Sequence, residues 1–117
     1  MINVRLPWPP QVNNYYAVVR GRKVLSAKGR AYKVDAAVEM LRQRAPRNLL
    51  SRLEVMIDAY PPDRRRRDID GIIKATLDAM QDYGLFRDDS QIDDLRVRRM
   101  EKAAGGYLRV HISELST

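Results

Sequence analysis

The sequence contains no cysteine and a single histidine, His111. The absence of cysteine excludes disulfide bonds, thiolate zinc sites and cysteine nucleophiles, and it is the usage expected of a protein in a reducing cytoplasm. One histidine excludes a metal site built from several imidazoles and argues against a histidine-based catalytic triad. His111 alternates with apolar neighbours, so we expect it on the outer face of a strand and assign it no catalytic role.

Long apolar runs are also missing. No stretch of about 18 apolar residues occurs, so we expect no transmembrane helix. The first six residues alternate between apolar and polar types and then meet prolines, which is unlike a signal peptide. We therefore expect a cytoplasmic protein with no membrane partner. The chain has 117 residues, of which 44% are hydrophobic, and residues 1–117 are expected to form one domain with its own core.

Charge is unevenly distributed along this basic chain. Lys and Arg number 22 against 15 acids, a net charge of +7, and most of the bases are arginine, whose planar guanidinium binds phosphate through two hydrogen bonds. Residues 63–94 carry a net charge of −3 and the rest of the chain +10. Cations that attract phosphates around carboxylates that hold a metal are typical of metal-dependent enzymes acting on nucleic acid. A basic protein with a solvated acidic patch would give the same counts.

The apolar periodicity predicts an α+β domain with a mixed β-sheet of about four strands and two helices. Period-two alternation predicts strands at residues 2–6, 53–59, 95–100 and 108–112. The last two are expected to pair as a hairpin turned by Gly105 and Gly106. Residues 13–16 are expected to form an exposed turn, and residues 18–25 a weak hairpin with a basic tip.

Two helices are predicted between these strands. The first begins at the N-cap residue Ser26 and ends near Arg44. Its helical spacing is carried by four apolar residues: Ala31, Val34, Val38 and Leu41. The second is expected from Asp68 to Tyr83, with Asp68 as N-cap and Gly84 just after its C-terminus.

Asp68 and Asp70 stand at the start of the second helix. Two residues apart, they would diverge inside a helix, but the cap residue is not yet helical and both can converge on one cation. Lys74 lies one turn beyond Asp70 on the same face, where it can pair with Asp70 or reach the same substrate oxygen. The alternative is a capping aspartate with a surface Asp–Lys pair worth about 0.3–0.5 kcal/mol.

A second pair of carboxylates, Asp88 and Asp89, follows this helix. Adjacent negative charges are unfavourable near a helix C-terminus, which is already the negative end of its dipole, and a bound cation would relieve them. The alternative is a solvated turn, where aspartate is common. Asp93 and Asp94 are expected to face solvent and are assigned no role.

Four consecutive arginines precede Asp68, namely Arg64, Arg65, Arg66 and Arg67. They repel one another unless they share an anion, and DNA phosphates are the obvious candidates. A solvated loop compensated by Asp63 and Asp68 is the alternative. Trp8, Tyr15 and Tyr16 could stack on exposed bases, although half-buried packing would also explain them.

Two other enzyme classes have related carboxylate patterns and fit less well. Phosphatases of the haloacid dehalogenase type place Asp-x-Asp after an apolar strand, whereas four arginines precede it in this chain. Many restriction-type nucleases place a carboxylate two residues before a lysine, whereas Asp70 and Lys74 are four residues apart. Neither pattern is matched.

The ordered features that remain are Leu6 to Pro10, Asn13-Asn14, the arginine-rich loop into Asp68-Ile69-Asp70, Lys74, and Asp88 to Gln91. Together they resemble the RusA family of Holliday junction resolvases, and the resemblance runs from the first strand to the final Gly-Gly turn. One departure is Gly71, where these relatives usually have asparagine. Gly71 has no side-chain amide to make the contact that asparagine could make, whereas all the carboxylates of the motif are present.

The resemblance implies a small homodimeric endodeoxyribonuclease, usually encoded by phages or prophages, that cuts four-way DNA junctions in DNA recombination and repair. It implies Mg²⁺ as cofactor, with Mn²⁺ as a substitute, and no small-molecule substrate. Carried over residue by residue, it implies metal-binding catalytic carboxylates at Asp68, Asp70 and Asp89 and a catalytic lysine at Lys74. It also implies a DNA contact near the site at Arg67, with Asp88 the weaker member of its pair.

Two non-enzymatic classes compete with this interpretation. A nucleic-acid-binding protein would use the same basic surface and keep the carboxylates as salt-bridge partners, and it would show salt-dependent binding without cleavage. A ribosome-like assembly protein would bind structured RNA at least as well as a DNA junction. Symmetry favours the resolvase as a dimer, because two symmetric nicks need two sites and one chain of this size offers one.

Overall fold

The protein, described over residues 1–115 by a computed structural model, is built on a four-stranded mixed sheet. Its strands are β1 (Ile2–Pro7), β4 (Leu53–Tyr60), β5 (Ile92–Arg99) and β6 (Tyr107–Glu114), and their order in the sheet is β1-β6-β4-β5. Strand β6 is antiparallel to β1 and β4, whereas β5 is parallel to β4. The predicted α+β domain with a four-stranded mixed sheet is confirmed.

The predicted hairpin between the last two strands is wrong, because β4 lies between β5 and β6. Strand β4 is the most apolar of the four, and its residues Val55 and Ile57 are fully buried. A central position gives such a strand a ladder on both edges, whereas the mostly exposed, arginine-rich β5 suits an edge. Gly105 and Gly106 still turn the chain, with φ of 78° and 67°, but within a connection that crosses from β5 to β6.

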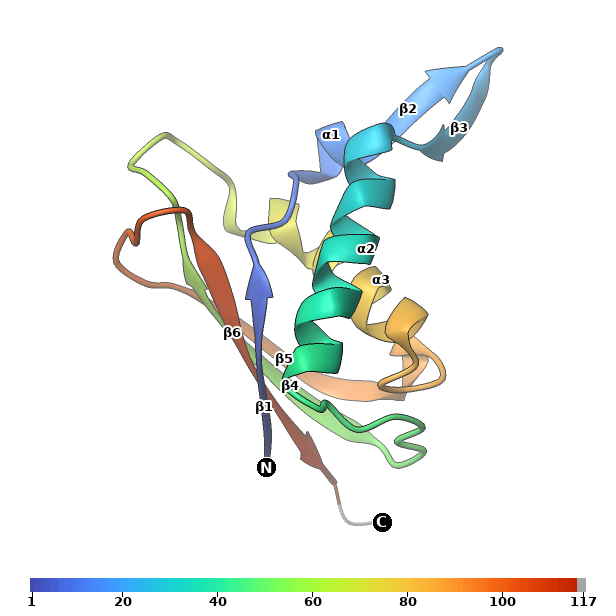
Figure 1. The fold of residues 1–117 in the computed structure, drawn as a ribbon, viewed down its shortest axis with the longest axis vertical. Coiled ribbons are helices and arrows are strands. Elements are labelled where there is room, and N and C mark those ends of the chain that lie inside the picture. Colours follow the sequence, from blue (N-terminus) through green and yellow to red (C-terminus); the bar gives the residue numbers. More distant parts are fainter. Residues whose placement is uncertain (116–117) are drawn as a thin grey trace.

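The helices cover one face of the sheet, and the other face is left open (Figure 1). The long helix α2 (Ala27–Arg42) crosses β1 and packs beside α3 (Ile73–Tyr83). The core between sheet and helices includes Leu6, Tyr32, Met40 and Phe86. Within residues 1–115, every helix is too short or too polar to span a membrane.

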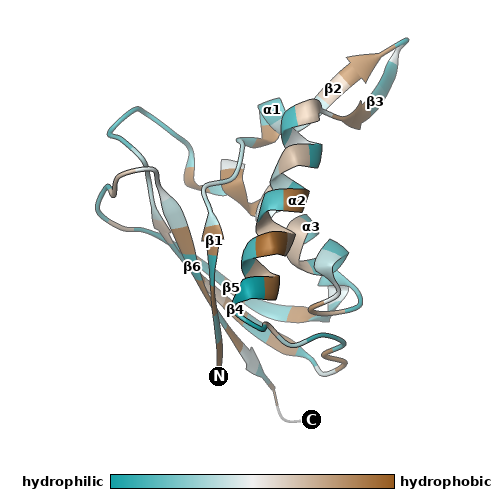
Figure 2. Cartoon of the chain, viewed as in Figure 1, coloured by the Kyte–Doolittle hydropathy of each residue, from teal (hydrophilic) through white to brown (hydrophobic). Residues whose placement is uncertain are grey.

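Helix α2 begins where the sequence predicts and buries a different face. The side chain of Ser26 accepts a hydrogen bond from the backbone N–H of Gly29 at 3.0 Å, which confirms the N-cap. The face against the core carries Tyr32, Ala36 and Met40. The apolar residues that indicated the helix lie on the outside instead, with exposures of 63% for Val34, 43% for Val38 and 62% for Leu41. Figure 2 shows hydrophobic segments along this otherwise polar helix.

The segment expected to be an exposed turn is the short helix α1 (Val12–Tyr15), and its Tyr15 is completely buried. The predicted weak hairpin follows it as β2 (Tyr16–Val19) and β3 (Arg22–Leu25). Figure 1 shows this hairpin projecting away from the body beyond the first turn of α2. A turn pattern does not reveal a buried aromatic ring, because the ring's neighbours come from other parts of the chain.

The second predicted helix starts with a turn of 3-10 helix, η1 (Ile69–Ile72), and continues as α3. Asp68 occupies the N-cap position of η1, but its side chain accepts no capping hydrogen bond. Gly84 ends α3 in the left-handed conformation, with φ of 94°, as expected for a C-terminal glycine. A second short 3-10 helix, η2 (Asp89–Gln91), then leads into β5.

One polar residue from each strand forms a row across the open face of the sheet. Asn3 of β1 contacts His111 of β6, and Asp58 of β4 lies 3.2 Å from the His111 ring and 3.0 Å from the guanidinium of Arg98 on β5. Asp58 is only 6% exposed. Burial would raise its pKa, but the hydrogen bonds with Arg98 and His111 outweigh that effect and lower it. His111 therefore lies on the outer face, as predicted, and serves as a structural partner.

We expect Asp58→Asn to lower the free energy of unfolding at neutral pH by about 1–3 kcal/mol, because a charged acceptor is lost from the row. The pKa of Asp58 in the folded state lies below its unfolded value of about 3.9, so its contribution is present above that pH and is lost as pH falls through the folded value. Urea unfolding from pH 7 to pH 2 should thus show wild type and variant converging in acid. Asp94→Asn, at an exposed position on β5, should keep the wild-type profile, and a constant gap down to pH 2 would contradict the assignment.

Candidate active site

The predicted site residues lie on three consecutive elements. Asp68 and Asp70 stand at the N-cap and in the first turn of η1, Lys74 is in the first turn of α3, and Asp89 begins η2. Helix α3 is therefore the support that holds the first two carboxylates at one end and approaches the third through its side chains. Its contact with η2 is direct, because the side-chain oxygen of Gln81 accepts the backbone N–H of Asp89 at 3.0 Å.

Lys74 pairs with Asp78, one turn along α3, and not with Asp70. The distance from Lys74 Nζ to Asp78 Oδ1 is 3.1 Å. This hydrogen bond is the main reason why the pKa of Lys74 is raised, and the negative charge of Asp89 acts in the same direction. The charge of Asp89 thus acts on the amine that the sequence singles out.

Asp78 is in turn held by Tyr15, a residue that sequence reasoning did not assign to the site. The Tyr15 hydroxyl donates to Asp78 Oδ2 at 2.9 Å, so the two carboxylate oxygens are divided between the tyrosine and the lysine. Burial, followed by the hydrogen bond to Asp78, raises the pKa of Tyr15. The four-residue spacing of Lys74 and Asp78 could have revealed that pair. The tyrosine contact spans 63 positions and has no local signature.

The acids between residues 63 and 94 divide into two groups in the described structure. Five of them have ion-pair or hydrogen-bond partners for their side chains: Asp63, Asp78, Asp82, Asp88 and Asp93. Over residues 1–115, no side-chain hydrogen bond or ion pair is formed by the other four: Asp68, Asp70, Asp89 and Asp94. Three of these four are the carboxylates predicted to bind metal, so the fold leaves them free for an external cation.

The predicted metal ligands have suitable chemistry, and they are not gathered into one cluster. Carboxylate oxygens are the ligands that Mg²⁺ prefers, and Mg²⁺ keeps several waters of its own. Within the part of the chain that the structure describes, no three His, Asp or Glu side chains lie close enough together to hold one ion. The joint role of Asp68, Asp70 and Asp89 therefore stays a prediction.

Asp88 has a structural role. Its side chain caps η2, and the Gln91 side chain accepts the backbone N–H groups of Arg87 and Asp88 in return, at 2.9 and 3.0 Å. Gln91 also donates to the backbone oxygens of Leu49 and Ser51. This network fixes the loop from which Asp89 projects.

The arginine-rich loop is only partly compensated by acids. Asp63 pairs with Arg67 at 2.7 Å and accepts the backbone N–H of Arg65, and the contact with Arg67 is the main cause of its lowered pKa. Asp68, the other acid considered as a compensating partner, forms no such pair in the described residues. Arg64 and Arg66 are exposed, and neither has an acidic partner within residues 1–115. These two arginines are free to contact phosphate.

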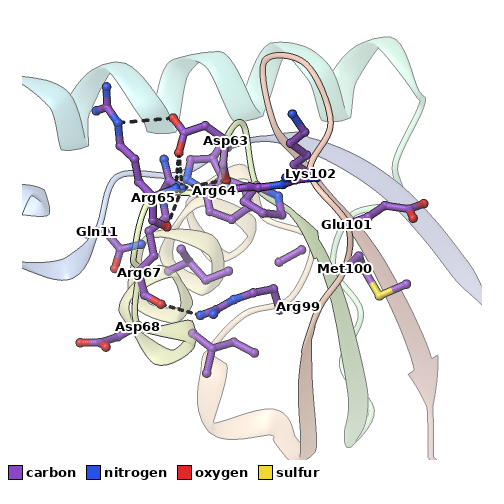
Figure 3. A pocket seen from close by; sticks show the side chains of 15 residues that line it. Gln11, Asp63, Arg64, Arg65, Arg67, Asp68, Arg99, Met100, Glu101 and Lys102 are labelled. Atoms are coloured by element: carbon purple, nitrogen blue, oxygen red, sulfur yellow. Dashed lines mark hydrogen bonds and ion pairs between the residues drawn. The ribbon is translucent and has the colours of Figure 1, made fainter.

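A cavity of about 330 Å³ lies behind this loop, between the end of β1 and the connection that follows β5. Figure 3 shows the loop residues, Gln11 and Asp68 together with Arg99 to Lys102 around it. Trp8 forms part of the lining, with the guanidinium carbon of Arg67 at 5.7 Å from the centre of its ring. Sequence reasoning missed Arg99 and Lys102, because only the crossing connection brings them to the arginine loop, and it missed Gln11, which lies in the segment after β1.

Gly71 is tightly enclosed in this chain. A Cβ atom placed on Gly71 would lie 1.8 Å from the side-chain oxygen of Gln11. The Gln11 side chain therefore fills the space that any side chain at position 71 would need. The two positions are sterically coupled in this chain.

Fold and site define a small, basic α+β protein with a cationic cavity lined in part by Asp68. A family model described as Endodeoxyribonuclease RusA matches residues 7–113, and the chain belongs to this endodeoxyribonuclease family. It is 39% identical to the crossover junction endodeoxyribonucleases of Enterobacteria phage 82 and of Escherichia coli strain K12, and 38% identical to that of Shigella sonnei. Each alignment covers 97% of this chain and 94% of the relative. The family predicted from the sequence is confirmed.

We expect Asp78→Asn to lower the pKa of the Lys74 amine, because the substitution removes the negative charge that holds the proton there. NMR titration of the reductively methylated protein, with Lys74→Arg to assign the signal, measures this value directly. Tyr15→Phe should change it less, since the tyrosine touches the lysine only through Asp78. An unchanged Lys74 titration in Asp78→Asn would contradict the pairing.

Proposed function

We propose that this protein is a Mg²⁺-dependent endodeoxyribonuclease that resolves four-way DNA junctions by paired symmetric nicks. The observation that carries the proposal is the selective freedom of Asp68, Asp70 and Asp89 in a segment where the other acids, apart from the distant Asp94, are paired. Family membership supplies the chemistry, because the relatives are named crossover junction endodeoxyribonucleases.

Asp68, Asp70 and Asp89 would hold the ion, which supplies charge neutralisation at the scissile phosphate and an acidified water when bound. The flanking side chains of this chain supply the rest. Lys74, which pairs with Asp78, would donate hydrogen bonds to a phosphate oxygen and stabilise the charge that develops there.

Binding of the DNA backbone falls to the basic loop. Arg64 and Arg66 are exposed, and we assign them to phosphates next to the cut site. Arg67 is held by Asp63 and lies over Trp8, so its first role is to shape the loop. It would contact DNA only from the wall of the cavity.

A homodimer is part of the proposal, because two symmetric nicks require two sites related by a two-fold axis. The exposed stripe of Val34, Val38 and Leu41 on α2 is the apolar surface that we assign to the interface. These three residues follow one another at helical spacing on the outer side of a helix whose inner side is already packed. A second copy would cover them by presenting the same stripe.

For the cleavage activity, we expect Asp70→Asn to abolish cutting of a synthetic four-way junction in Mg²⁺ while the fold and junction binding are kept, because one ligand and one negative charge are removed. The assay compares junction and linear duplex on a sequencing gel, with Mg²⁺, Mn²⁺ or EDTA. Asp94→Asn makes the same charge change at an unpaired position outside the site and should cut like wild type.

Paired symmetric nicks in the junction alone, lost with EDTA and in Asp70→Asn, would establish the metal-dependent resolvase. Binding without cleavage in every divalent metal and every crossover sequence tested would favour the non-catalytic DNA-binding alternative. Cleavage by Asp70→Asn at the wild-type rate would show that the metal ligands are wrongly assigned.

For the dimer, we expect Leu41→Glu to yield monomers at micromolar concentration, because a charge would be buried in the interface. Sedimentation velocity measures the change. Leu50→Glu is the matched control, since Leu50 is 68% exposed and lies outside the stripe, and this variant should sediment as a dimer. Wild-type protein that sediments as a monomer would contradict the dimer itself, and a dimeric Leu41→Glu would place the interface elsewhere.

A further inference from the structure

The cavity behind the arginine loop has an apolar interior. Trp8, Ile69, Ile72 and Met100 line it together with the carbon-rich surface of Pro61. Ile69 is 38% exposed although it is a large aliphatic residue next to the predicted metal ligands. Phosphate gains nothing from such a surface, whereas a flat uncharged ring can bury its faces there. The cavity volume of about 330 Å³ falls in the range of small-molecule sites.

A hydrogen-bond donor in the lining has no partner. The side-chain nitrogen of Gln11 is buried, and among the described residues nothing accepts its protons. The oxygen of the same amide lies against Gly71, in the space that a Cβ at this position would occupy. Buried donors are nearly always satisfied in folded proteins, so an unsatisfied one next to a cavity is a position where a bound ligand or an ordered water supplies the acceptor.

Charged residues surround the apolar interior and indicate what this ligand is attached to. Five basic residues line the cavity, namely Arg64, Arg65, Arg67, Arg99 and Lys102, and they outnumber its three acids, Asp63, Asp68 and Glu101 (Figure 3). A free apolar molecule would have no use for this excess of cations. A nucleotide unit would, because its base enters the interior while its phosphates stay among the cations.

We propose that the cavity receives one unstacked nucleobase of the DNA strand whose phosphate lies at Asp68. The base stacks on Trp8 and accepts a hydrogen bond from the side-chain nitrogen of Gln11. This inference rests on the proposed function for its DNA substrate, and it names a base-binding subsite next to the cut. A four-way junction offers such a base at its crossover, where pairs are opened more easily than within a continuous duplex. Stacking tolerates every base, so Gln11 is the residue that favours bases presenting an acceptor to it.

Trp8 is the only tryptophan of the chain, so the intrinsic fluorescence of the protein at long wavelength reports on this cavity alone. We expect saturation with a four-way junction in EDTA to quench Trp8 emission by about half, because a stacked base quenches an indole ring. A linear duplex, bound to the same extent at low salt as judged by anisotropy of a labelled strand, should leave the emission nearly unchanged. Junction binding to saturation with unaltered Trp8 emission would overturn the proposal.

Junctions that lack one base identify which nucleotide places its base in the cavity. A tetrahydrofuran residue is placed in turn at each position around the crossover. At one position, removal of the base should abolish the quenching and weaken wild-type binding about tenfold, whereas Gln11→Ala, which has already lost the hydrogen bond, should be weakened less by the same lesion. Arg64→Gln is the control, and it should weaken binding to all the junctions by the same factor. Equal effects at every position would contradict a base-specific pocket.

Gly71→Ala tests whether Gln11 acts from its observed place. The added methyl group displaces the Gln11 side chain, so this variant should lose the same preference among crossover sequences as Gln11→Ala, and the double variant should lose no more. Additive losses would overturn the role of Gln11. The fluorescence and binding measurements do not use cleavage, so a protein that quenches without cutting refutes the proposed function alone. A protein that cuts with Trp8 unaffected refutes the subsite alone.

Discussion

The double pairing of β4 is the constraint on which the rest of the structure depends. Because β4 has a partner on each edge, the chain that leaves β5 must cross over the end of β4 to reach β6. That connection is tied to the end of β4 by the backbone hydrogen bonds from Met100 to Ala59 and from Ala103 to Pro61. Gly106 approaches Pro62 so closely that a Cβ there would lie 2.7 Å from the proline ring. The arginine loop and the crossing connection are thereby held together as two walls of one cavity.

Helix α3 extends this frame to the carboxylates. Its first turn carries Lys74, and the residues one and two turns further along the same side, Asp78 and Gln81, hold the lysine and the Asp89 loop respectively. The buried Tyr15 anchors this side of the helix from α1. Ion pairs and hydrogen bonds thus hold the supporting residues, whereas the three carboxylates predicted to bind metal have no such partners within residues 1–115. The proposed uptake of a cation and of DNA would suit this arrangement, because no internal ion pair of these carboxylates would have to be broken first.

The two faces of the molecule are shaped by different demands. The open face of the sheet carries a row of polar contacts centred on Asp58, in which each strand is linked to the next by side chains as well as by the backbone ladder. On the covered side, α2 is packed inward through Tyr32 and Met40 and leaves Val34 and Leu41 outside. A helix that is apolar on two sides has a second surface to bury. The proposed two-fold symmetry would therefore account both for the paired nicks and for the exposed apolar stripe on α2.

Local chemistry determined much of this protein in advance. Capping by Ser26, the terminating Gly84 and the alternation in β4 all depend on residues a few positions apart, and the structure confirms each of them. The glycine turn before β6 is also present, but it does not close the predicted hairpin. The family was also evident from the sequence, because its motif is contiguous from the arginines through Asp68 and Asp70 to Lys74. Periodicity alone could not say which apolar side of α2 faces the core, since both sides of the helix carry apolar residues.

Tertiary structure decided what depends on distant partners. The order of strands depends on which strand gains the most stability from hydrogen-bonded ladders on both of its edges. That comparison involves all the strands of the sheet. The contact between Tyr15 and Asp78 and the enclosure of Gln11 against Gly71 join residues about sixty positions apart in the chain. The sequence by itself determined the elements, the family and the chemically active residue types. Only the folded chain determined which of those residues are held by partners and which are left free to act.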